Sequence, residues 1–216
     1  MKHAMMGNTL YTVGKIVCVG RNYALHIKEL GHEFPDQPLF FLKPASAIIY
    51  SGEDVIYPSF SDLLHYETEL VVLIGRTVKD VSESEAENAI AGFGVGFDMT
   101  LRDIQNEEIK KGNPWTVSKC FDTSAVISEF VPKEECNIKA DTTIKLSVNG
   151  EIKQHAELGS MIFKPAQLIS FISSRITLEE GDLIFTGTPE GVGPVQRGDI
   201  LEAEITSVGK LKARIK

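Results

Sequence analysis

The sequence predicts a β-dominated α+β fold. Short apolar runs rich in β-branched residues recur along the chain, and helices do not follow them in regular alternation, which disfavours a doubly wound parallel sheet. The chain has 216 residues, enough to bury a large core without disulfides. Because β-rich folds often reach about 200–250 residues as one unit, we expect an irregular N-terminal arm over residues 1–14 and a single domain over residues 15–216.

The first half of the chain contains four runs that are typical of strands: Lys15–Gly20, Leu39–Leu42, Glu69–Ile74 and Gly92–Phe97. The almost continuous apolar run from Glu69 to Ile74 is typical of a strand that is buried on both faces. The alternating glycines of Gly92–Phe97 indicate a place where another backbone or a ligand comes close.

The second half of the chain begins with a predicted hairpin. Asn149-Gly150 lies between the strand-like runs Thr143–Val148 and Glu151–His155, and this dipeptide is the strongest short-range hairpin signal. Further strands are predicted at Leu183–Phe185, Ile200–Ile205 and Lys210–Ile215.

Four helices are predicted, at Tyr23–Leu30, Ser82–Ile90, Thr100–Lys111 and Pro165–Ile176. Ser82 and Glu85 have the spacing of a capping box. Thr100 is a candidate N-cap for the third helix, and Gly112 is typical of its end. Pro165 suits the first turn of the fourth helix.

The composition excludes several classes of protein. Hydrophobic residues make up 43% and charged residues 24% of the chain, which excludes disorder for most of its length. No apolar run reaches the roughly 18 residues of a membrane span, and residues 1–10 lack the apolar core of a secretory signal, so we expect a cytoplasmic protein without a membrane partner. A net charge of −8 disfavours nucleic acid as a partner. The three cysteines form no C-x-x-C pair and predict neither a disulfide framework nor a zinc site.

Three acidic residues are candidate metal ligands. Glu67 and Glu69 are two apart, so in a strand they point to the same face, about 6–7 Å apart, and repel each other unless a cation lies between them. Asp98 ends the glycine-rich run. If the three converge, they form an oxygen-rich site for Mg²⁺, Mn²⁺ or Ca²⁺. The alternatives are an exposed strand end for the two glutamates and an N-cap role for Asp98.

Basic and polar residues follow Asp98. Arg102 and Gln105, at i+4 and i+7 from Asp98, would share one face of a helix and could hold a substrate carboxylate and carbonyl. A surface ion pair of Arg102 with Asp98 or Asp103 is the alternative. Lys119 lies among uncharged neighbours and could neutralise an enolate, or it could be an ordinary solvated lysine.

Two further segments carry possible chemistry. His26 and Glu29 are neighbours on a helix, and a carboxylate beside a histidine orients the ring as a general base; two surface residues are the alternative. The stretch from Phe185 to Pro194 is rich in glycine but lacks a Walker motif. Its amides near Gly187, together with Thr188, could cradle an oxyanion, or the stretch could be a plain turn.

Five motifs occur together in a fixed order: Gly20-Arg21-Asn22-Tyr23 with His26 and Glu29, Glu67-x-Glu69, Gly96-Phe97-Asp98-Met99-Thr100, Ser118-Lys119, and Gly187-Thr188-Pro189-x-Gly191-Val192-Gly193. Each is weak alone. Together they resemble the fumarylacetoacetate hydrolase (FAH) family, in particular its small single-domain members of the FAH domain-containing protein 1 type, over about residues 15–216. Tyr66 and Thr68 depart from the common pattern without touching the predicted ligands.

The resemblance implies a mixed β-roll like the FAH C-terminal domain, with a few peripheral helices, in a homodimer that binds Mg²⁺ or Mn²⁺ (Ca²⁺ can take the same ligands in a crystal). It implies Glu67, Glu69 and Asp98 as the metal ligands. His26 and Glu29 would form the catalytic pair that activates water, with Lys119 acting at the oxo-acid end of the substrate. The implied substrate contacts are Arg21, Arg102, Gln105, Gly187 and Thr188.

The implied activity is metal-dependent hydrolysis of a carbon–carbon bond in an acylpyruvate or fumarylpyruvate, which gives pyruvate and a carboxylic acid. The substrate would be a small 2-oxo acid. Alternatives on the same site are an oxaloacetate decarboxylase or tautomerase, or an isomerase or decarboxylase of the 2-hydroxyhepta-2,4-diene-1,7-dioate type. A non-catalytic binding module stabilised by a metal is a third hypothesis.

Overall fold

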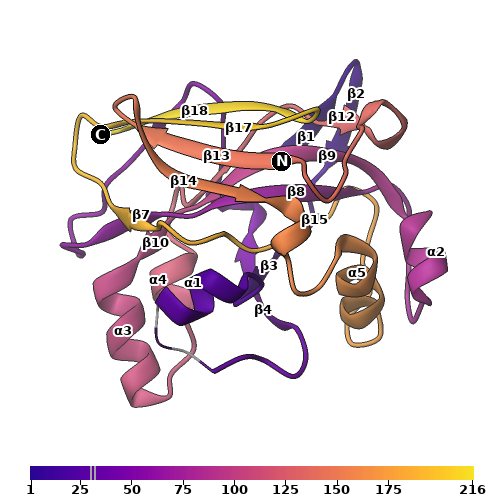
Figure 1. Cartoon of the computed structure of the whole chain (residues 1–216), viewed down its shortest axis with the longest axis horizontal. Helices are drawn as coiled ribbons and strands as arrows, with labels where there is room; N and C mark the ends of the chain where they lie inside the picture. The colour runs from indigo at the N-terminus through magenta and orange to yellow at the C-terminus, as the bar shows by residue number, and fades with distance from the viewer. Residues whose placement is uncertain (30, 32) are drawn as a thin grey trace.

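Figure 1 shows the computed structural model, which describes residues 1–29, 31 and 33–216. The predicted β-dominated α+β fold is confirmed, with the strands across the upper part of the view and the short helices below them and at the right (Figure 1). The largest sheet is curved and mixed, because β15 and β3 are parallel and β11 and β5 are parallel while the other neighbours are antiparallel.

Within the described residues the strands form four sheets. The eight-stranded sheet has the order β4 (Leu39–Pro44), β3 (Lys15–Gly20), β15 (Leu183–Phe185), β8 (Thr68–Ile74), β9 (Ile90–Asp98), β11 (Ala125–Ile127) and β5 (Ile48–Tyr50), with β12 (Val131–Pro132) also on β9. The five-stranded sheet has the order β14 (Glu151–Glu157), β13 (Thr143–Val148), β17 (Ile200–Ile205), β18 (Gly209–Ile215) and β6 (Asp54–Val55). The three-stranded sheet joins β10 (Thr100–Leu101), β7 (Leu64–Tyr66) and β16 (Gly193–Pro194), and the two-stranded sheet joins β1 (His3–Met6) and β2 (Thr9–Thr12).

The main core lies between the eight-stranded and the five-stranded sheet. Leu70 and Val95 of the larger sheet and Leu146 and Leu201 of the smaller sheet belong to one cluster of buried side chains. The strand β8 is buried along its whole length, as its continuous apolar run predicts. The core therefore holds β8 and β9 rigidly, and these two strands carry the predicted acidic residues.

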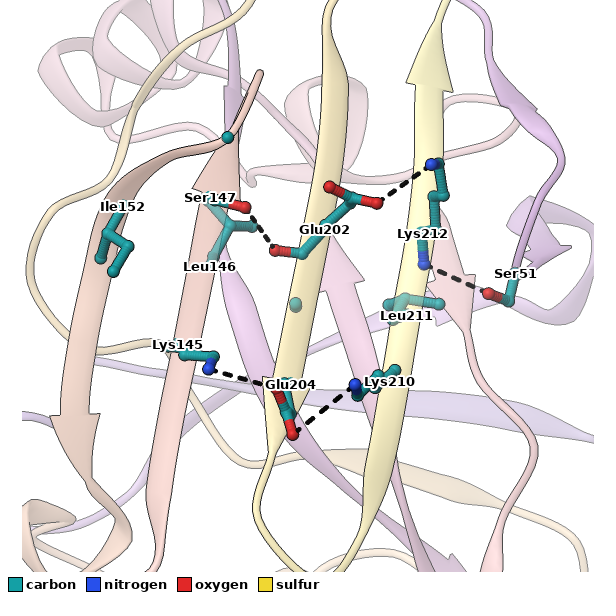
Figure 2. Close-up of a pocket in the computed structure, with 12 residues that line it drawn as sticks. Ser51, Lys145, Leu146, Ser147, Ile152, Glu202, Glu204, Lys210, Leu211 and Lys212 are labelled. Atoms are coloured by element: carbon teal, nitrogen blue, oxygen red, sulfur yellow. Dashed lines mark hydrogen bonds and ion pairs between the residues drawn. The ribbon is translucent and has the colours of Figure 1, made fainter.

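The outer face of the five-stranded sheet is covered with paired charges (Figure 2). Glu204 of β17 is bound from both sides, by Lys145 at 3.2 Å and by Lys210 at 4.0 Å. Glu202 accepts from Lys212 at 3.0 Å in the next cross-strand pair. Cross-strand pairs of opposite charge are typical of the solvent-facing side of an antiparallel sheet. The apolar side chains of the same strands face the core.

The predicted hairpin at Asn149-Gly150 is confirmed. β13 and β14 pair in antiparallel fashion on either side of it. Asn149 has φ 51° and Gly150 has φ 83°, the positive values that a type I′ turn requires.

The N-terminal segment differs from the sequence prediction. An irregular arm is expected before Lys15, but β1 and β2 form an antiparallel hairpin whose Ala4 is buried. Phe130 donates its backbone N–H to the carbonyl of Met5 at 2.7 Å, which fastens the hairpin to the rest of the protein. Gly7-Asn8 supplies the two-residue turn, with Gly7 at φ 56°. A Gly-Asn pair is itself a hairpin signal, but the residues around it lack a clear alternation.

The helices are α1 (Ala24–Glu29), α2 (Glu83–Glu87), α3 (Arg102–Lys111), α4 (Thr116–Lys119) and α5 (Pro165–Ser173), with single turns η1 (Ala45–Ala47), η2 (Lys133–Glu135) and η3 (Leu158–Ser160). Figure 1 shows α1, α3 and α4 together at one end of the molecule and α2 and α5 at the other. Among the described residues, no helix is long and apolar enough to cross a membrane.

One predicted helix start is wrong. The third helix begins at Arg102, because Thr100 and Leu101 remain extended and pair with β7. Thr100 donates its hydroxyl to the carbonyl of Asp98 at 3.1 Å instead of capping the helix. The predicted end is confirmed, since Gly112 is the C-cap in the left-handed conformation.

The other helices largely follow the predictions. The capping box of Ser82 and Glu85 is present, but α2 ends at Glu87 because the chain enters β9 at Ile90. Pro165 begins α5 as predicted, and the helix ends at Ser173 rather than at Ile176. The first helix ends at Glu29; its predicted last residue, Leu30, lies outside the described residues.

Candidate active site

The three predicted carboxylates converge. Glu67 immediately precedes β8, Glu69 lies in β8, and Asp98 ends the neighbouring strand β9. The pairing continues past β8, because Asp98 donates its backbone N–H to the carbonyl of Glu67 at 2.9 Å. Each side chain offers one oxygen atom, and these atoms lie within 4.8 Å of one another. All three residues are buried, so the exposed-strand-end and N-cap alternatives are wrong.

Glycine in β9 permits the close packing behind these carboxylates. Gly96 lies opposite Glu69 in the sheet. A Cβ atom on Gly96 would come within 2.5 Å of both Phe185 and Val71. The predicted close approach of another backbone occurs at Gly92, where an added Cβ would meet the carbonyl oxygen of Val131, whereas at Gly96 the close neighbours are side chains.

Lys119 is a buried member of the cluster. It is the last residue of α4 and places its Nζ atom 2.6 Å from Glu67, 2.8 Å from Asp98 and 2.6 Å from the Thr100 hydroxyl. The alternative of an ordinary solvated lysine is wrong. Although burial favours the neutral amine, the carboxylates of Asp98 and Glu67 outweigh it and raise the pKa of Lys119.

Lys43 is a second buried lysine, and the sequence analysis missed it. Its Nζ atom lies 2.8 Å from Asp98 Oδ1. It also donates to the backbone carbonyls of Met99 at 3.2 Å and Ser124 at 3.0 Å, and to that of Lys119. A lysine at the end of the apolar run Leu39–Leu42 is the one signal that could have pointed to it.

Arg102 and Gln105 lie near the carboxylates, but not because they share a helix face with Asp98 as predicted. Asp98 is in a strand and not on α3, so it does not share a helix face with them. Arg102 donates instead to Glu67 and to the side-chain oxygen of Gln105. Both residues are buried, which excludes the surface ion pair; Asp103 accepts from Ser61 and Asp62.

The surroundings of the two glutamates shift their pKa values in opposite directions. Burial disfavours the charged form of Glu67, but Lys119 and Arg102 outweigh it and hold the pKa of Glu67 well below its ordinary value. For Glu69, burial and the nearby charges of Asp98 and Glu67 act together and raise its pKa well above the ordinary value. Glu69 accepts the backbone N–H of Gly187 at 2.6 Å. Among the described residues, no lysine, arginine or histidine lies within ion-pair distance of Glu69.

His26 and Glu29 form the predicted pair on α1. His26 Nδ1 lies 3.1 Å from the Glu29 carboxylate, and the histidine is buried, so the surface alternative is wrong for it. The Glu29 side chain is 34% exposed and also accepts the backbone N–H of Gly191 at 3.1 and 3.3 Å. His26 lines the same cavity as Glu67 and Glu69.

The glycine-rich loop contributes differently from the prediction. The Gly187 amide donates to Glu69 and is therefore occupied by a protein carboxylate. Thr188 lines the cavity, and its hydroxyl accepts from Gln154 at 2.8 Å, which leaves its own proton free to donate. Gln154, in β14, also accepts the backbone N–H of Thr68 at 3.1 Å. Gln154 is absent from the predicted site. It lies in a hairpin strand of mixed polarity, where nothing in the sequence marks it as a site residue.

Arg21 also lines the cavity. It has φ 59°, a left-handed conformation that is unusual for arginine. Its Nε atom is buried and has no hydrogen-bond partner among the described residues. An unpaired guanidinium nitrogen beside a cavity is available for an anionic ligand.

The cavity has a volume of about 40 Å³. The three carboxylates, Lys119 and Arg102 line one side. The ring of Phe41, the indole of Trp115 and Ile109 of α3 complete its wall. The protein thus encloses a small polar cavity with an apolar boundary.

Residues 15–216 match the model of the fumarylacetoacetate (FAA) hydrolase C-terminal family. The chain belongs to the fumarylacetoacetate hydrolase family. The recognition made from the five motifs is therefore confirmed.

Two relatives and one solved structure are examples of the FAH-family proteins that this chain resembles. Over 200 residues it is 46% identical to "Oxaloacetate tautomerase FAHD1, mitochondrial" of Bos taurus, with 93% of this chain and 90% of that protein covered. Over 192 residues it is 46% identical to "Oxaloacetate tautomerase YcgM" of Escherichia coli (strain K12), with 88% of each covered. The structure of fumarylpyruvate hydrolase from Pseudomonas aeruginosa in complex with Mn²⁺ and pyruvate has 37% identity and a TM-score of 0.94, covering 99% of this chain and 94% of that one.

The residues of this FAH-family site fit a divalent metal ion. Glu67, Glu69 and Asp98 offer the carboxylate oxygens that Mg²⁺ and Mn²⁺ prefer. Asp98 Oδ1 accepts no well-aligned hydrogen bond within the described part of the chain, although Lys43 lies near it. Glu69 is the buried carboxylate with the weakest compensation, because burial and the charges of Asp98 and Glu67 outweigh the effects of Lys119 and the Gly187 amide. A divalent ion held by these carboxylates would compensate the charge of Glu69.

Replacement of Gly187 by alanine is expected to destabilise the protein and to lower its activity. Gly187 has φ 95°, and a Cβ atom there would meet Asn22 Cβ at 2.8 Å. Gly198 is the matched control, because it has φ 98° but nothing within 4 Å of an added Cβ. Strain from the positive φ costs about 1–3 kcal/mol in either variant. Urea denaturation should show a larger loss for Gly187→Ala; equal losses would contradict the steric role.

Proposed function

We propose that this protein is a divalent-metal-dependent enzyme that acts on small 2-oxo acids, with keto–enol tautomerisation of oxaloacetate as its reaction. The observation that carries the proposal is the buried cluster of Glu67, Glu69 and Asp98 in one cavity with His26, which is paired with Glu29. The relatives named oxaloacetate tautomerase, at 46% identity over most of both chains, support this choice among the reactions that such a site can perform.

The charges of the site suit a dianionic substrate. With all three acidic side chains ionised as metal ligands, Glu67, Glu69 and Asp98 would carry three negative charges, and Lys43, Lys119 and Arg102 lie against them with three positive charges. A divalent metal ion held by the three carboxylates would make this set positive by two and would act as a Lewis acid on the 2-oxo group. Arg21 adds a further positive charge at the cavity wall. Oxaloacetate, with two carboxylates, complements this field.

The His26–Glu29 pair is the proposed proton carrier. If Glu29 accepts from the Nδ1–H of His26, the Nε2 atom is left as the basic nitrogen. In tautomerisation His26 removes a proton from the carbon next to the 2-oxo group and returns a proton to oxygen, or the reverse. Lys119 and Gln105 stabilise the charge that develops on the substrate oxygen.

Hydrolysis of acylpyruvates is the second candidate, and the same pair favours it. Here His26 would take a proton from water while the oxygen attacks the distal carbonyl. The carbon–carbon bond then breaks to give a carboxylic acid and the enolate of pyruvate, which is protonated. The fumarylpyruvate hydrolase with a TM-score of 0.94 supports this reading. The homodimer and the cytoplasmic compartment stay predictions.

His26→Ala and Glu29→Ala are each expected to lower turnover by about 10²–10⁴-fold, the usual contribution of a positioned general base. The assay follows the ultraviolet absorbance of the oxaloacetate enol, and in parallel the cleavage of acetylpyruvate and fumarylpyruvate, with Mg²⁺ or Mn²⁺ and after addition of EDTA. His155→Ala is the control, because His155 is exposed on β14.

The outcomes separate the hypotheses. Metal-dependent loss of the enol signal without cleavage supports the tautomerase, and release of pyruvate from an acylpyruvate supports the hydrolase. Wild-type rates in both His26→Ala and Glu29→Ala would exclude the proton-transfer role. A metal that raises the melting temperature without turnover of any of the three substrates would leave only the non-catalytic binding module.

A further inference from the structure

Two cavities meet at one pair of aromatic side chains. The inner cavity contains the carboxylate cluster, and an outer hollow of about 310 Å³ lies between residues 39–42 of β4 and residues 113–116 before and at the start of α4. Phe41 and Trp115 line both spaces. We call this pair the aromatic partition.

The rings of Phe41 and Trp115 pack against each other in an edge-to-face arrangement. Their centroids are 5.7 Å apart with an angle of 65° between the ring planes. The ammonium group of Lys119 lies 5.0 Å from the centroid of the Phe41 ring, so the partition reaches the charged cluster. The indole of Trp115 lies beside Gly20 at the end of β3, where an added Cβ would contact it at 3.5 Å. The partition therefore bounds the inner cavity directly beside the predicted metal site.

The outer hollow has the chemistry of a site for an apolar group. Its described lining consists of Leu39, Phe40, Phe41, Leu42, Asn113, Pro114, Trp115 and Thr116, and none of these carries a charge. Leu39 and Leu42 are 37% and 46% exposed, so apolar area there is open to burial by a ligand. Its volume lies near the lower end of the range of about 300–1,000 Å³ for small-molecule pockets, whereas the inner cavity of about 40 Å³ is far smaller.

We propose that the aromatic partition sets the length of the substrate. A 2-oxo acid with a short remainder, such as pyruvate or oxaloacetate, binds within the inner cavity while the rings stay in contact. A 2-oxo acid with an unbranched apolar tail must separate Phe41 from Trp115 to place that tail in the outer hollow. This inference rests on the proposed function for the identity of the oxo-acid head group.

Removal of the indole tests the partition. Trp115→Ala joins the two spaces and leaves intact the hydrogen bonds that Ser118 and Lys119 donate to the backbone carbonyl of Trp115. The dissociation constants of pyruvate and 2-oxooctanoate are measured by calorimetry with saturating Mg²⁺. The ratio of the two affinities is expected to shift toward 2-oxooctanoate by at least tenfold in Trp115→Ala, since two or more methylene groups gain apolar burial. Phe41→Leu should shift it in the same direction, less strongly.

Val117→Ala is the matched control, because Val117 follows Trp115 by two residues, is 57% exposed and lines neither space. An unchanged ratio of the affinities for pyruvate and 2-oxooctanoate in Trp115→Ala would overturn the proposal that the partition sets the length of the substrate. Failure of pyruvate to bind the wild-type protein with Mg²⁺ would instead contradict the proposed function, so the two failures are distinguishable.

The wild-type protein offers a second readout, because Trp115 is its only tryptophan. Its fluorescence therefore reports on the partition without any substitution. Saturating 2-oxooctanoate should shift the emission maximum, while saturating pyruvate should leave it in place. The same emission maximum with both bound ligands would show that the rings do not separate for the longer tail.

Discussion

Replacing Glu69 by glutamine is expected to lower the turnover of 2-oxo acids by two orders of magnitude or more. Groups that merely orient metal ligands already contribute about 10- to 100-fold to metal affinity or activity, and Glu69 is itself a predicted ligand. The same variant should lose the rise in melting temperature that Mn²⁺ gives the wild-type protein. Glu151→Gln is the control, since that side chain is 74% exposed.

The metal-free Glu69→Gln protein should be more stable than the metal-free wild type near neutral pH. The pKa of Glu69 is raised in the folded protein above its ordinary value of 4.5 by burial and by two neighbouring carboxylates. The folded state therefore binds this proton more tightly than the unfolded state. Its stabilising contribution is complete below pH 4.5 and is lost as the pH rises toward the raised pKa.

Glutamine removes this dependence, so the stability profiles of the two metal-free proteins should diverge with rising pH. Urea denaturation between acid and neutral pH, with EDTA present, measures the difference. Undiminished turnover and an unchanged effect of Mn²⁺ in Glu69→Gln would exclude Glu69 as a ligand. Undiminished turnover after replacement of all three acidic residues by their amides would exclude the whole metal site.

The second large effect is expected for Lys119→Met, which should destabilise the metal-free protein by about 3–5 kcal/mol. Glu67 and Asp98 are buried, and Lys119 contacts both at 2.6 and 2.8 Å. Methionine fills a similar volume but leaves both anions with less compensation. A divalent ion replaces part of the lost positive charge, so Mn²⁺ should stabilise Lys119→Met more than it stabilises the wild type.

Lys145→Met is the matched comparison. Lys145 forms an ion pair of 3.2 Å with Glu204, but its side chain is 47% exposed. Such surface pairs contribute about 0–1 kcal/mol. Chemical denaturation of the two variants therefore separates burial from ion pairing as the source of the effect, and similar losses would show that the position of Lys119 in the cluster has no special energetic role.

The acidic cluster could be predicted because its geometry is mostly local. Glu67 and Glu69 share a face through strand periodicity, and Asp98 joins them because the strand that it ends pairs with β8. The family motifs added the His26–Glu29 pair, whose spacing on a helix already makes its members neighbours. The strand period and the helix spacing thus specify which side chains of one element lie on the same face.

The residues that could not be predicted owe their positions to contacts between elements that are distant in the sequence. Lys43 reaches Asp98 across 55 positions, and its place at the end of a short apolar run is a weak signal that also fits a solvated lysine at a strand end. Gln154 lies in a hairpin strand whose other polar residues face solvent, and its burial depends on the loop that follows Thr188. The N-terminal hairpin was missed for the same reason, because its buried Ala4 becomes meaningful only once Phe130 lies beside it.

Glu29 holds two partners with one carboxylate, the imidazole of His26 and the backbone of Gly191. Because His26 and Glu29 both lie on α1, a displacement of this helix as a unit would keep them paired but would break the contact with Gly191. The helix would then carry away the basic nitrogen and release the glycine-rich loop in the same movement. The position of the imidazole and the anchoring of the glycine-rich loop thus both depend on where α1 lies.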